Sequence, residues 1–349
     1  MIVGVPSETA PGESRVALDP PAAKKLVNRG LDVLVTAGAG TGAGWSDQAY
    51  REASCEVVDD RGAVFERADV IVQVRGLGAN EDGPVDPYRQ GQVVVGLLGP
   101  YEIADDTLSM LAERGVSAFA LELVPRISRA QGMDVLTSMA SVAGYKGVVL
   151  AANELPKLVP MQMTAAGTVR PANVFVVGAG VAGLQAIATA KRLGARIRAY
   201  DIRPDVKEEV ESLGAEFLDL DVDAADSATI DGYAREQAEA VVREQRRQMA
   251  DAVAAADIVV TTAAVPGRPA PELVTADMVE RMAAGSVVVD LGAASGGNCE
   301  CTTPGETTVY DDVTIVGQTN LPSAVSHTAS QLFASNVVAF VTSLLADGD

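Results

Sequence analysis

The segment 174–201 constrains the fold of this chain more than any other stretch of the sequence. It begins with a short apolar run, continues into Gly178-Ala179-Gly180-Val181-Ala182-Gly183, and ends at Asp201 after a second apolar run. An alanine-rich stretch between the two runs stops at Gly194, a residue typical of a helix C-terminus. This order predicts a strand, a G-x-G-x-x-G turn, a helix and a second strand, which together form a dinucleotide-binding unit.

Each conspicuous residue of this segment has a mechanical role in that interpretation. Gly178 allows the tight turn, Gly180 lets the backbone approach a pyrophosphate at the helix N-terminus, and Gly183 lets the helix pack closely on the strand. Asp201 can accept a hydrogen bond from a ribose 2′-hydroxyl and would repel a 2′-phosphate, which favours NAD(H) over NADP(H). Arg203 leaves the phosphate form open. The alternative to binding is a βαβ unit that keeps the turn and holds no ligand.

The rest of the chain alternates short apolar runs with polar helical stretches, which predicts parallel sheets covered by helices. Before residue 125 we expect strands at 2–5, 32–36, 70–74, 93–98 and 116–121, with helices such as 20–29 and 105–114. After Asp201 we expect strands at 216–220, 258–262, 287–291 and 314–316. The predicted fold is α/β, with two Rossmann-like, doubly wound domains joined by long helices and a cleft between them.

The domain boundaries follow from the connecting segments. A helix over 138–155, rich in small residues, is expected to join the domains, and an irregular lead-in at 158–170 precedes the glycine motif. A final helix from about Ser330 is expected to return to the first domain. We therefore predict an N-terminal domain of residues 1–136 plus 320–349 and an NAD(H)-binding domain of residues 137–319. The small-residue stretches 261–267 and 292–298 follow strands and leave room for a cofactor.

Composition excludes several classes of function. The 349 residues carry a net charge of −20, which argues against nucleic-acid binding. Three cysteines and one histidine are too few for a disulfide framework or a zinc site, so we expect no metal and a reducing, cytoplasmic compartment. No apolar run predicts a membrane-spanning helix, the best candidate being 332–345, and the N-terminus lacks a signal peptide. The glycine-rich segment 38–44 predicts a turn rather than a second phosphate loop.

Two polar segments are candidates for ligand contact. Residues 123–138 should form an exposed loop dense in hydrogen-bonding side chains, although a solvated linker explains the pattern equally well. Residues 221–249 are long and polar, and Tyr233 at a flexible tip suggests a lid, with an irregular surface insertion as the alternative.

The chain resembles the alanine dehydrogenase and pyridine-nucleotide transhydrogenase superfamily over essentially its full length. Gly4-Val5-Pro6-Ser7-Glu8 and Glu13-Ser14-Arg15-Val16-Ala17-Leu18 are similar to the superfamily's opening signature. Three longer segments, 125–131, 163–168 and 183–195, look specifically like the transhydrogenase branch, and they resemble the separate NAD(H)-binding subunit of its three-subunit forms.

Acid–base chemistry separates the two branches. Alanine dehydrogenases carry a histidine near position 97 and an aspartate just before the position of Gly296-Gly297, but this chain has Leu97 and Ser295 there. Arg15 matches a substrate-binding arginine of those enzymes, and Arg75 stands where they have a lysine. An arginine cannot exchange protons at neutral pH, whereas direct hydride transfer between two nicotinamides needs no acid–base group. The resemblance therefore favours a transhydrogenase, with an alanine-type dehydrogenase and a non-enzymatic NAD-binding protein as alternatives.

The resemblance also implies site residues and partners. Positioning of the nicotinamide is implied for Arg126, Gln131, Asp134 and Thr137, where the family usually has serine at the last position. Other cofactor contacts are implied for Ile127, Ser128, Arg129, Gly178, Gly180, Val181, Gly183, Asp201, Ile202, Arg203, Gly232, Tyr233, Gln245 and Ala264. The implied assembly is a homodimer, peripheral on the cytoplasmic face of the cell membrane. It works with a membrane-spanning proton-translocating subunit and a subunit that binds NADP(H).

Overall fold

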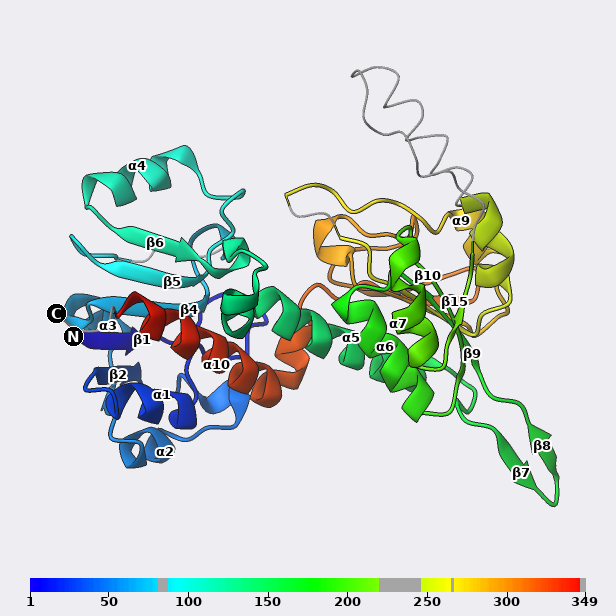
Figure 1. The fold of residues 1–349 in the computed structure, drawn as a ribbon, viewed down its shortest axis with the longest axis horizontal. Helices are drawn as coiled ribbons and strands as arrows, with labels where there is room; N and C mark the ends of the chain where they lie inside the picture. Colours follow the sequence, from blue (N-terminus) through cyan, green and yellow to red (C-terminus); the bar gives the residue numbers. More distant parts are fainter. Residues whose placement is uncertain (81–86, 220–245, 265–266, 346–349) are drawn as a thin grey trace. The chain divides into compact units, whose positions relative to one another are not determined.

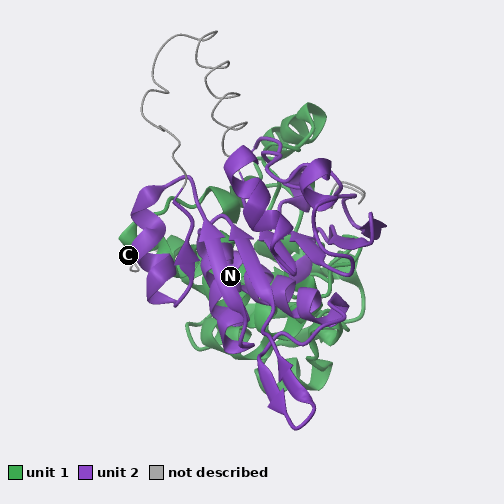
Figure 2. Cartoon of the chain, turned by 90° about the vertical axis from the view of Figure 1, so that its right-hand side faces the viewer, with its two compact units in different colours: residues 1–139, 322–349 green, residues 140–321 purple. Residues whose placement is uncertain are grey.

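The computed structural model describes residues 1–80, 87–219, 246–264 and 267–345. The chain divides into two compact units, one formed by residues 1–139 and 322–349 and the other by residues 140–321 (Figure 2). Each unit is an α/β fold built around its own parallel sheet, so the predicted fold class is confirmed.

The sheet of the first unit has six parallel strands in the order β3-β2-β1-β4-β5-β6 (Figure 1). Because β1 pairs with both β2 and β4, the strand order reverses between β1 and β4, as in other doubly wound sheets. The strands are β1 (Ile2–Val5), β2 (Asp32–Thr36), β3 (Glu56–Val58), β4 (Val70–Arg75), β5 (Val93–Leu97) and β6 (Ser117–Ala120).

Helices cover this sheet because apolar side chains project from both of its faces. Ile71 and Val94 pack with Phe65 of α3 and Leu111 of α4 in one buried cluster. The helices are α1 (Pro20–Val27), α2 (Asp47–Glu52), α3 (Arg61–Arg67), α4 (Asp105–Glu113) and α10 (Ser326–Leu344). Short 3₁₀ turns are η1 (Thr41–Ala43), η2 (Leu77–Ala79), η3 (Leu121–Leu123), η4 (Ser128–Met133) and η7 (Leu321–Val325).

The C-terminal helix α10 begins at Ser326, four residues before the expected start, and packs on the first unit. The hydroxyl of Ser330 accepts a hydrogen bond from the backbone N–H of Val16 (3.0 Å). The ring of His327 stacks on Trp45 at 4.6 Å between centroids, and its Nδ1 lies 2.8 Å from the carbonyl oxygen of Ala43. The glycine-rich segment 38–44, against which His327 packs, forms a turn through its own backbone hydrogen bonds and contains η1.

The sheet of the second unit has seven strands in the order β11-β10-β9-β12-β13-β15-β14. All neighbours are parallel except β14 and β15, and the antiparallel edge strand β14 was not expected from the sequence. The strands are β9 (Asn173–Val177), β10 (Arg196–Tyr200), β11 (Glu216–Phe217), β12 (Ile258–Thr261), β13 (Val287–Asp290), β14 (Thr307–Tyr310) and β15 (Val313–Val316).

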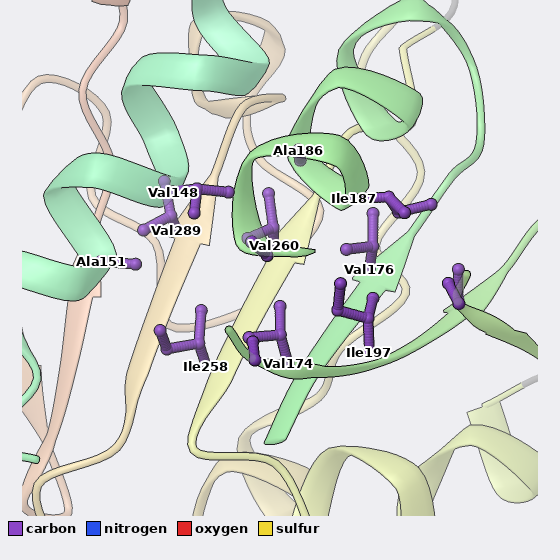
Figure 3. Packing of buried hydrophobic residues seen from close by; sticks show 14 of the residues in the cluster. Val148, Ala151, Val174, Val176, Ala186, Ile187, Ile197, Ile258, Val260 and Val289 are labelled. Carbon is purple, nitrogen blue, oxygen red and sulfur yellow. The ribbon is translucent and has the colours of Figure 1, made fainter. Parts of the chain in front are cut away.

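Alternate residues of these strands enter two separate cores, as the twofold period of a strand requires. On one face Val174 and Val260 pack against α6 (Val181–Arg192) and against Val148 of α5 (Val135–Glu154), as Figure 3 shows. On the other face Phe175 packs with Met249 of a helix over 246–254 and with α9 (Ala276–Val279). The remaining helical segments are η5 (Pro204–Val206), α7 (Lys207–Ser212) and η6 (Ala293–Ser295).

Helix α5 corrects the expectation about apolar segments. This helix has 20 residues, and the mean hydropathy of its most apolar window is 1.4. By length and composition alone it could therefore span a membrane, although no segment was expected to meet these requirements. In the structure Val148 and Ala151 of α5 are buried against the sheet, and 39% of that apolar window is buried, so core packing accounts for part of the apolar composition. A Cβ on Gly144 would lie 2.1 Å from the carbonyl oxygen of Ala182, so the small residue permits close helix packing.

The prediction of irregular structure over 158–170 is wrong. Residues Gln162–Thr164 (β7) and Gly167–Val169 (β8) form an antiparallel hairpin that extends from the second unit (Figure 1). Gly167 adopts a φ of +133°, which only glycine tolerates readily. Strands of three residues, with every side chain exposed, lack the apolar alternation by which a strand is recognised.

Candidate functional site

The glycine motif forms the turn between β9 and α6 in the second unit. Gly178 has a φ of +100°, and a Cβ there would lie 2.4 Å from the hydroxyl of Thr262. A Cβ on Gly183 would lie 1.8 Å from the carbonyl oxygen of Gly178, so helix and turn approach closely. A Cβ on Gly180 meets no atom within 4 Å, which leaves the space in front of the helix N-terminus open. Gly178 and Gly183 thus shape the turn as the sequence predicted, while the contact of Gly180 with a pyrophosphate stays a prediction.

Thr262, at the end of the neighbouring strand β12, supports this turn. Its hydroxyl lies 3.1 Å from the carbonyl oxygen of Gly178 and 3.3 Å from that of Val177, within hydrogen-bond distance of both. The sequence indicated only that small residues after β12 would leave room for a ligand. The support by Thr262 depends on β9 and β12 being neighbours, which the strand order determines.

Asp201 follows β10 and its carboxylate is held against the glycine turn. One oxygen accepts a hydrogen bond from the backbone N–H of Ala179 (2.7 Å), and the other accepts one from the backbone N–H of Arg203 (2.9 Å). Burial would raise the pKa of Asp201, but the hydrogen bonds from Arg203 and from these N–H groups outweigh it and lower the pKa. Asp201 is therefore a carboxylate at neutral pH, as recognition of a ribose hydroxyl requires.

Apolar side chains flank the turn without being buried. Val181 at the start of α6 is 41% exposed, and Ile202 beside the carboxylate is 53% exposed. Ala264, after β12, is also exposed. Exposed apolar groups beside polar anchors are typical of small-molecule sites. Gly232, Tyr233 and Gln245, which the resemblance assigned to the cofactor, lie outside the described residues.

Asp290 organises the loop that follows β13, a role that was not predicted from the sequence. This fully buried carboxylate ends β13 and accepts hydrogen bonds from the hydroxyls of Thr261 (2.9 Å) and Thr302 (2.8 Å). It also accepts bonds from the backbone N–H groups of Gly292, Asn298 and Cys299 at 2.7–3.0 Å. The sequence signal for this role was an aspartate at the end of a run of valines, followed by a glycine-rich loop.

Replacement of Asp290 by alanine is expected to lower the free energy of unfolding by about 3 kcal/mol or more, because it leaves buried donors without an acceptor. Asparagine keeps one acceptor oxygen, so Asp290→Asn should cost clearly less. Urea unfolding of the two variants followed by circular dichroism measures the difference. A loss below about 1 kcal/mol in Asp290→Ala would show that the loop does not depend on this carboxylate.

The loop of the first unit that carries the remaining predicted residues is a 3₁₀ turn followed by the start of α5. Arg126, Ile127, Ser128, Arg129 and Gln131 are exposed, as the sequence predicted, which fits a binding loop and a solvated linker alike. The carboxylate of Asp134 accepts hydrogen bonds from the backbone N–H (2.9 Å) and hydroxyl (2.7 Å) of Thr137. Asp134 is thus the N-cap of α5, and the structure brings Asp134 and Thr137 together.

Two acidic side chains near the carboxyl end of the first sheet are held by hydrogen bonds within that unit. The guanidinium of Arg15 forms two bonds with the buried carboxylate of Glu13, from Nε (2.7 Å) and Nη2 (2.6 Å). The carboxylate of Glu8 accepts from the backbone N–H groups of Val74 (2.6 Å) and Arg75 (3.0 Å). Burial raises the pKa of Glu8 to about 8, although these two bonds act in the opposite direction. Arg15, which the resemblance matched to a substrate-binding arginine of alanine dehydrogenases, is thus bonded to Glu13 in this chain.

The cysteines are not arranged as a reactive or metal-binding group. Cys55, Cys299 and Cys301 are free, and burial raises the pKa of the Cys55 thiol to about 11 and that of Cys299 to about 12. Within the described ranges, no group of three or more histidine, cysteine, aspartate or glutamate side chains could hold a metal ion.

Comparison with known proteins matches both units to one family. Residues 4–143 match the alanine dehydrogenase/PNT N-terminal domain, and residues 147–349 match the alanine dehydrogenase/PNT C-terminal domain. The chain is 45% identical over 345 residues to the first of the separate parts of the NAD(P) transhydrogenase alpha subunit of Rhodospirillum rubrum, covering 98% of this chain and 90% of that protein. It is 31% identical to an alanine dehydrogenase of Halomonas elongata, covering 100% of this chain and 88% of that protein.

A solved structure extends the likeness to three dimensions. A crystal structure of transhydrogenase from Sinorhizobium meliloti superposes with a TM-score of 0.86 at 44% identity, covering 99% of this chain and 94% of that one. The identity is therefore higher to these two transhydrogenase proteins than to the alanine dehydrogenase, while all three extend over nearly the whole chain.

Proposed function

This chain belongs to the alanine dehydrogenase/PNT family, and we propose that it is the NAD(H)-binding catalytic subunit of a proton-translocating NAD(P) transhydrogenase. In this proposal hydride passes directly between NAD(H) bound here and NADP(H) bound on a partner subunit. A membrane subunit couples the transfer to proton translocation.

The observation that carries the proposal is the fit of the second unit to a dinucleotide. The open space at Gly180 gives a pyrophosphate access to the N-terminus of α6, and the ionised Asp201 stands where a ribose hydroxyl would donate. Val181 and Ile202 supply apolar surface beside these polar anchors. These features, with Gly178 and Gly183 shaping the turn, support NAD(H) as the ligand.

The choice of transhydrogenase over amino-acid dehydrogenase rests on what the chain lacks in sequence. Leu97 and Ser295 stand where alanine dehydrogenases carry a histidine and an aspartate, so an amino-acid substrate would find no proton acceptor from these positions. Bound NAD(H) supplies the hydride, and its transfer to a second nicotinamide requires the protein only to position the ring and exclude water.

We assign the positioning role to the loop of the first unit. Arg126, Gln131, Asp134 and Thr137 are proposed to orient the nicotinamide and its ribose, with Ile127, Ser128 and Arg129 contacting the same end of the dinucleotide. The bonds between Asp134 and Thr137 fix the geometry of two of these side chains before ligand binds. In the second unit, Arg203, Gly232, Tyr233, Gln245 and Ala264 complete the proposed set.

The proposed assembly is a homodimer that joins an NADP(H)-binding subunit and a membrane-spanning subunit on the inner face of the cell membrane. The name of the Rhodospirillum rubrum relative describes one of several parts of an alpha subunit, which supports a divided complex. The exposed hairpin β7–β8, where Met163 is 74% exposed, offers apolar side chains for a contact between copies.

Mixing the purified chain with an NADP(H)-binding subunit is expected to give hydride exchange between an NADH analogue and NADP⁺. Absorbance of the analogue measures the rate, and sedimentation of the mixture measures complex formation. A complex that forms but transfers no hydride would contradict the proposal. Reduction of NAD⁺ by alanine without a partner would instead support the amino-acid dehydrogenase alternative.

A further inference from the structure

The cation nearest the ribose-recognition carboxylate comes from the same loop. Besides its backbone N–H, Arg203 donates to Asp201 from Nε (3.0 Å, to Oδ1) and from Nη2 (3.1 Å, to Oδ2). The side chain of Asp201 is only 8% exposed, whereas that of Arg203 is 55% exposed. The Asp201 carboxylate is therefore fixed in the fold, and the Arg203 guanidinium lies over it on the surface.

The hydrogen-bonding capacity of the carboxylate is already used. A carboxylate offers about four acceptor positions, and Asp201 receives two backbone donors and two guanidinium donors. The backbone donors are fixed by the turn and by the loop. A ribose hydroxyl that binds Asp201 must therefore take the place of a guanidinium N–H, and the displaced guanidinium stays at the edge of the ribose site.

The acidic groups around Arg203 oppose the binding of a phosphate to this cation in the native protein. Asp201 lies in contact with it, and Asp205 and Glu209 also act on it electrostatically. A dianionic 2′-phosphate would meet these carboxylates, while the guanidinium donors remain engaged. If Asp201 lost its charge, the same guanidinium would be released at the position where a 2′-phosphate extends from the ribose.

We propose that Arg203 is the second specificity-determining residue of this site, held on Asp201 in the native protein and converted into a 2′-phosphate ligand when the Asp201 charge is removed. The inference rests on the proposed function, because it assumes that the second unit binds NAD(H). Arg203 then acts on NAD(H) through Asp201 as a positioning residue, and on NADP(H) directly.

Binding of NADH and NADPH to the full chain tests this inference without a partner subunit. Nicotinamide fluorescence titrations would compare the wild type with Asp201→Asn, Arg203→Ala and the double variant. Asparagine keeps an oxygen for the Ala179 N–H, so the turn retains its support. We expect Asp201→Asn to bind NADH about tenfold more weakly and NADPH about tenfold more tightly. Arg203→Ala alone should still reject NADPH.

The double variant decides the role of Arg203. The gain in NADPH affinity should disappear when Arg203→Ala is added to Asp201→Asn, and Arg203→Lys in that background should retain some of it. Arg198→Ala is the matched control, because it removes a positive charge from β10 that pairs with Glu216 at 3.3 Å. The ratio of NADPH to NADH affinity should not change in that control.

Two outcomes would overturn different claims. Equal NADPH affinity in Asp201→Asn and in the double variant would refute the role of Arg203 while leaving the proposed function intact. A wild-type chain that binds neither dinucleotide would overturn the proposed function itself, and the inference with it.

Discussion

Replacement of Gln131 by asparagine, or of Asp134 by asparagine, is expected to slow hydride transfer about 100-fold while changing NADH affinity less than about threefold. Both side chains belong to the loop proposed to orient the nicotinamide, so their loss acts on the reacting geometry rather than on the adenosine and pyrophosphate. Single-turnover exchange with the NADP(H)-binding subunit measures the rate, and equilibrium titration measures the affinity.

The capping role of Asp134 makes its variant informative. Asparagine is as good an N-cap as aspartate, so Asp134→Asn should keep α5 and the bond to the Thr137 N–H while removing the negative charge. Thr137→Ser is the matched control, because it retains the hydroxyl that donates to Asp134 and should transfer hydride at nearly the wild-type rate. Equal losses in transfer rate and in NADH affinity would refute the orienting role.

The regions of the fold that sequence predicts well are those in which local pattern and global packing agree. Buried parallel strands such as β12 and β13 are short, continuous apolar runs, and their two faces both enter cores. Two glycines of the turn are required by the fold itself, Gly178 because of its positive φ and Gly183 because a Cβ would clash with a carbonyl oxygen. At Gly180 the protein leaves open space, so a requirement for glycine there would come from a ligand.

The regions that sequence does not predict depend on which elements become neighbours. Nothing local to Asp290 indicates that five donors, one from β12 and four from the loop after β13, will converge on its carboxylate. The hairpin β7–β8 and the edge strand β14 escape notice because exposed strands lack an apolar pattern. The apolar composition of α5 suits a membrane as well as a core, and only the structure shows that Val148 and Ala151 pack against the sheet.

The structure also changes how Asp201 and Arg203 of the candidate site are interpreted. In the sequence, Asp201 favours one cofactor and Arg203 leaves the other open, as if the two were independent signals. In the structure they form one ion pair, in which the buried carboxylate holds the exposed guanidinium. Asp201 and Arg203 are therefore one signal rather than two independent ones. The distances within the loop show this pairing, whereas the residue types alone do not.

Replacement of Gly180 by alanine is expected to abolish most NADH binding, weakening it at least about tenfold, while the free energy of unfolding changes by less than about 1 kcal/mol. The added methyl group meets no protein atom within 4 Å, and the φ of −76° at this position suits alanine. The methyl group would occupy the space through which a pyrophosphate reaches the N-terminus of α6. Fluorescence titration with NADH and urea unfolding of the same preparation measure the two quantities.

Gly183→Ala is the matched comparison within the same motif, because its methyl group would lie 1.8 Å from the carbonyl oxygen of Gly178. Backbone atoms cannot move aside without a large cost in free energy. This variant should therefore lose about 3 kcal/mol of stability or fail to fold, whatever ligand the turn holds. A stable Gly180→Ala protein that binds NADH as tightly as the wild type would show that the turn serves only the fold. The contrast between the two variants therefore separates a glycine kept for the fold from a glycine kept for the dinucleotide.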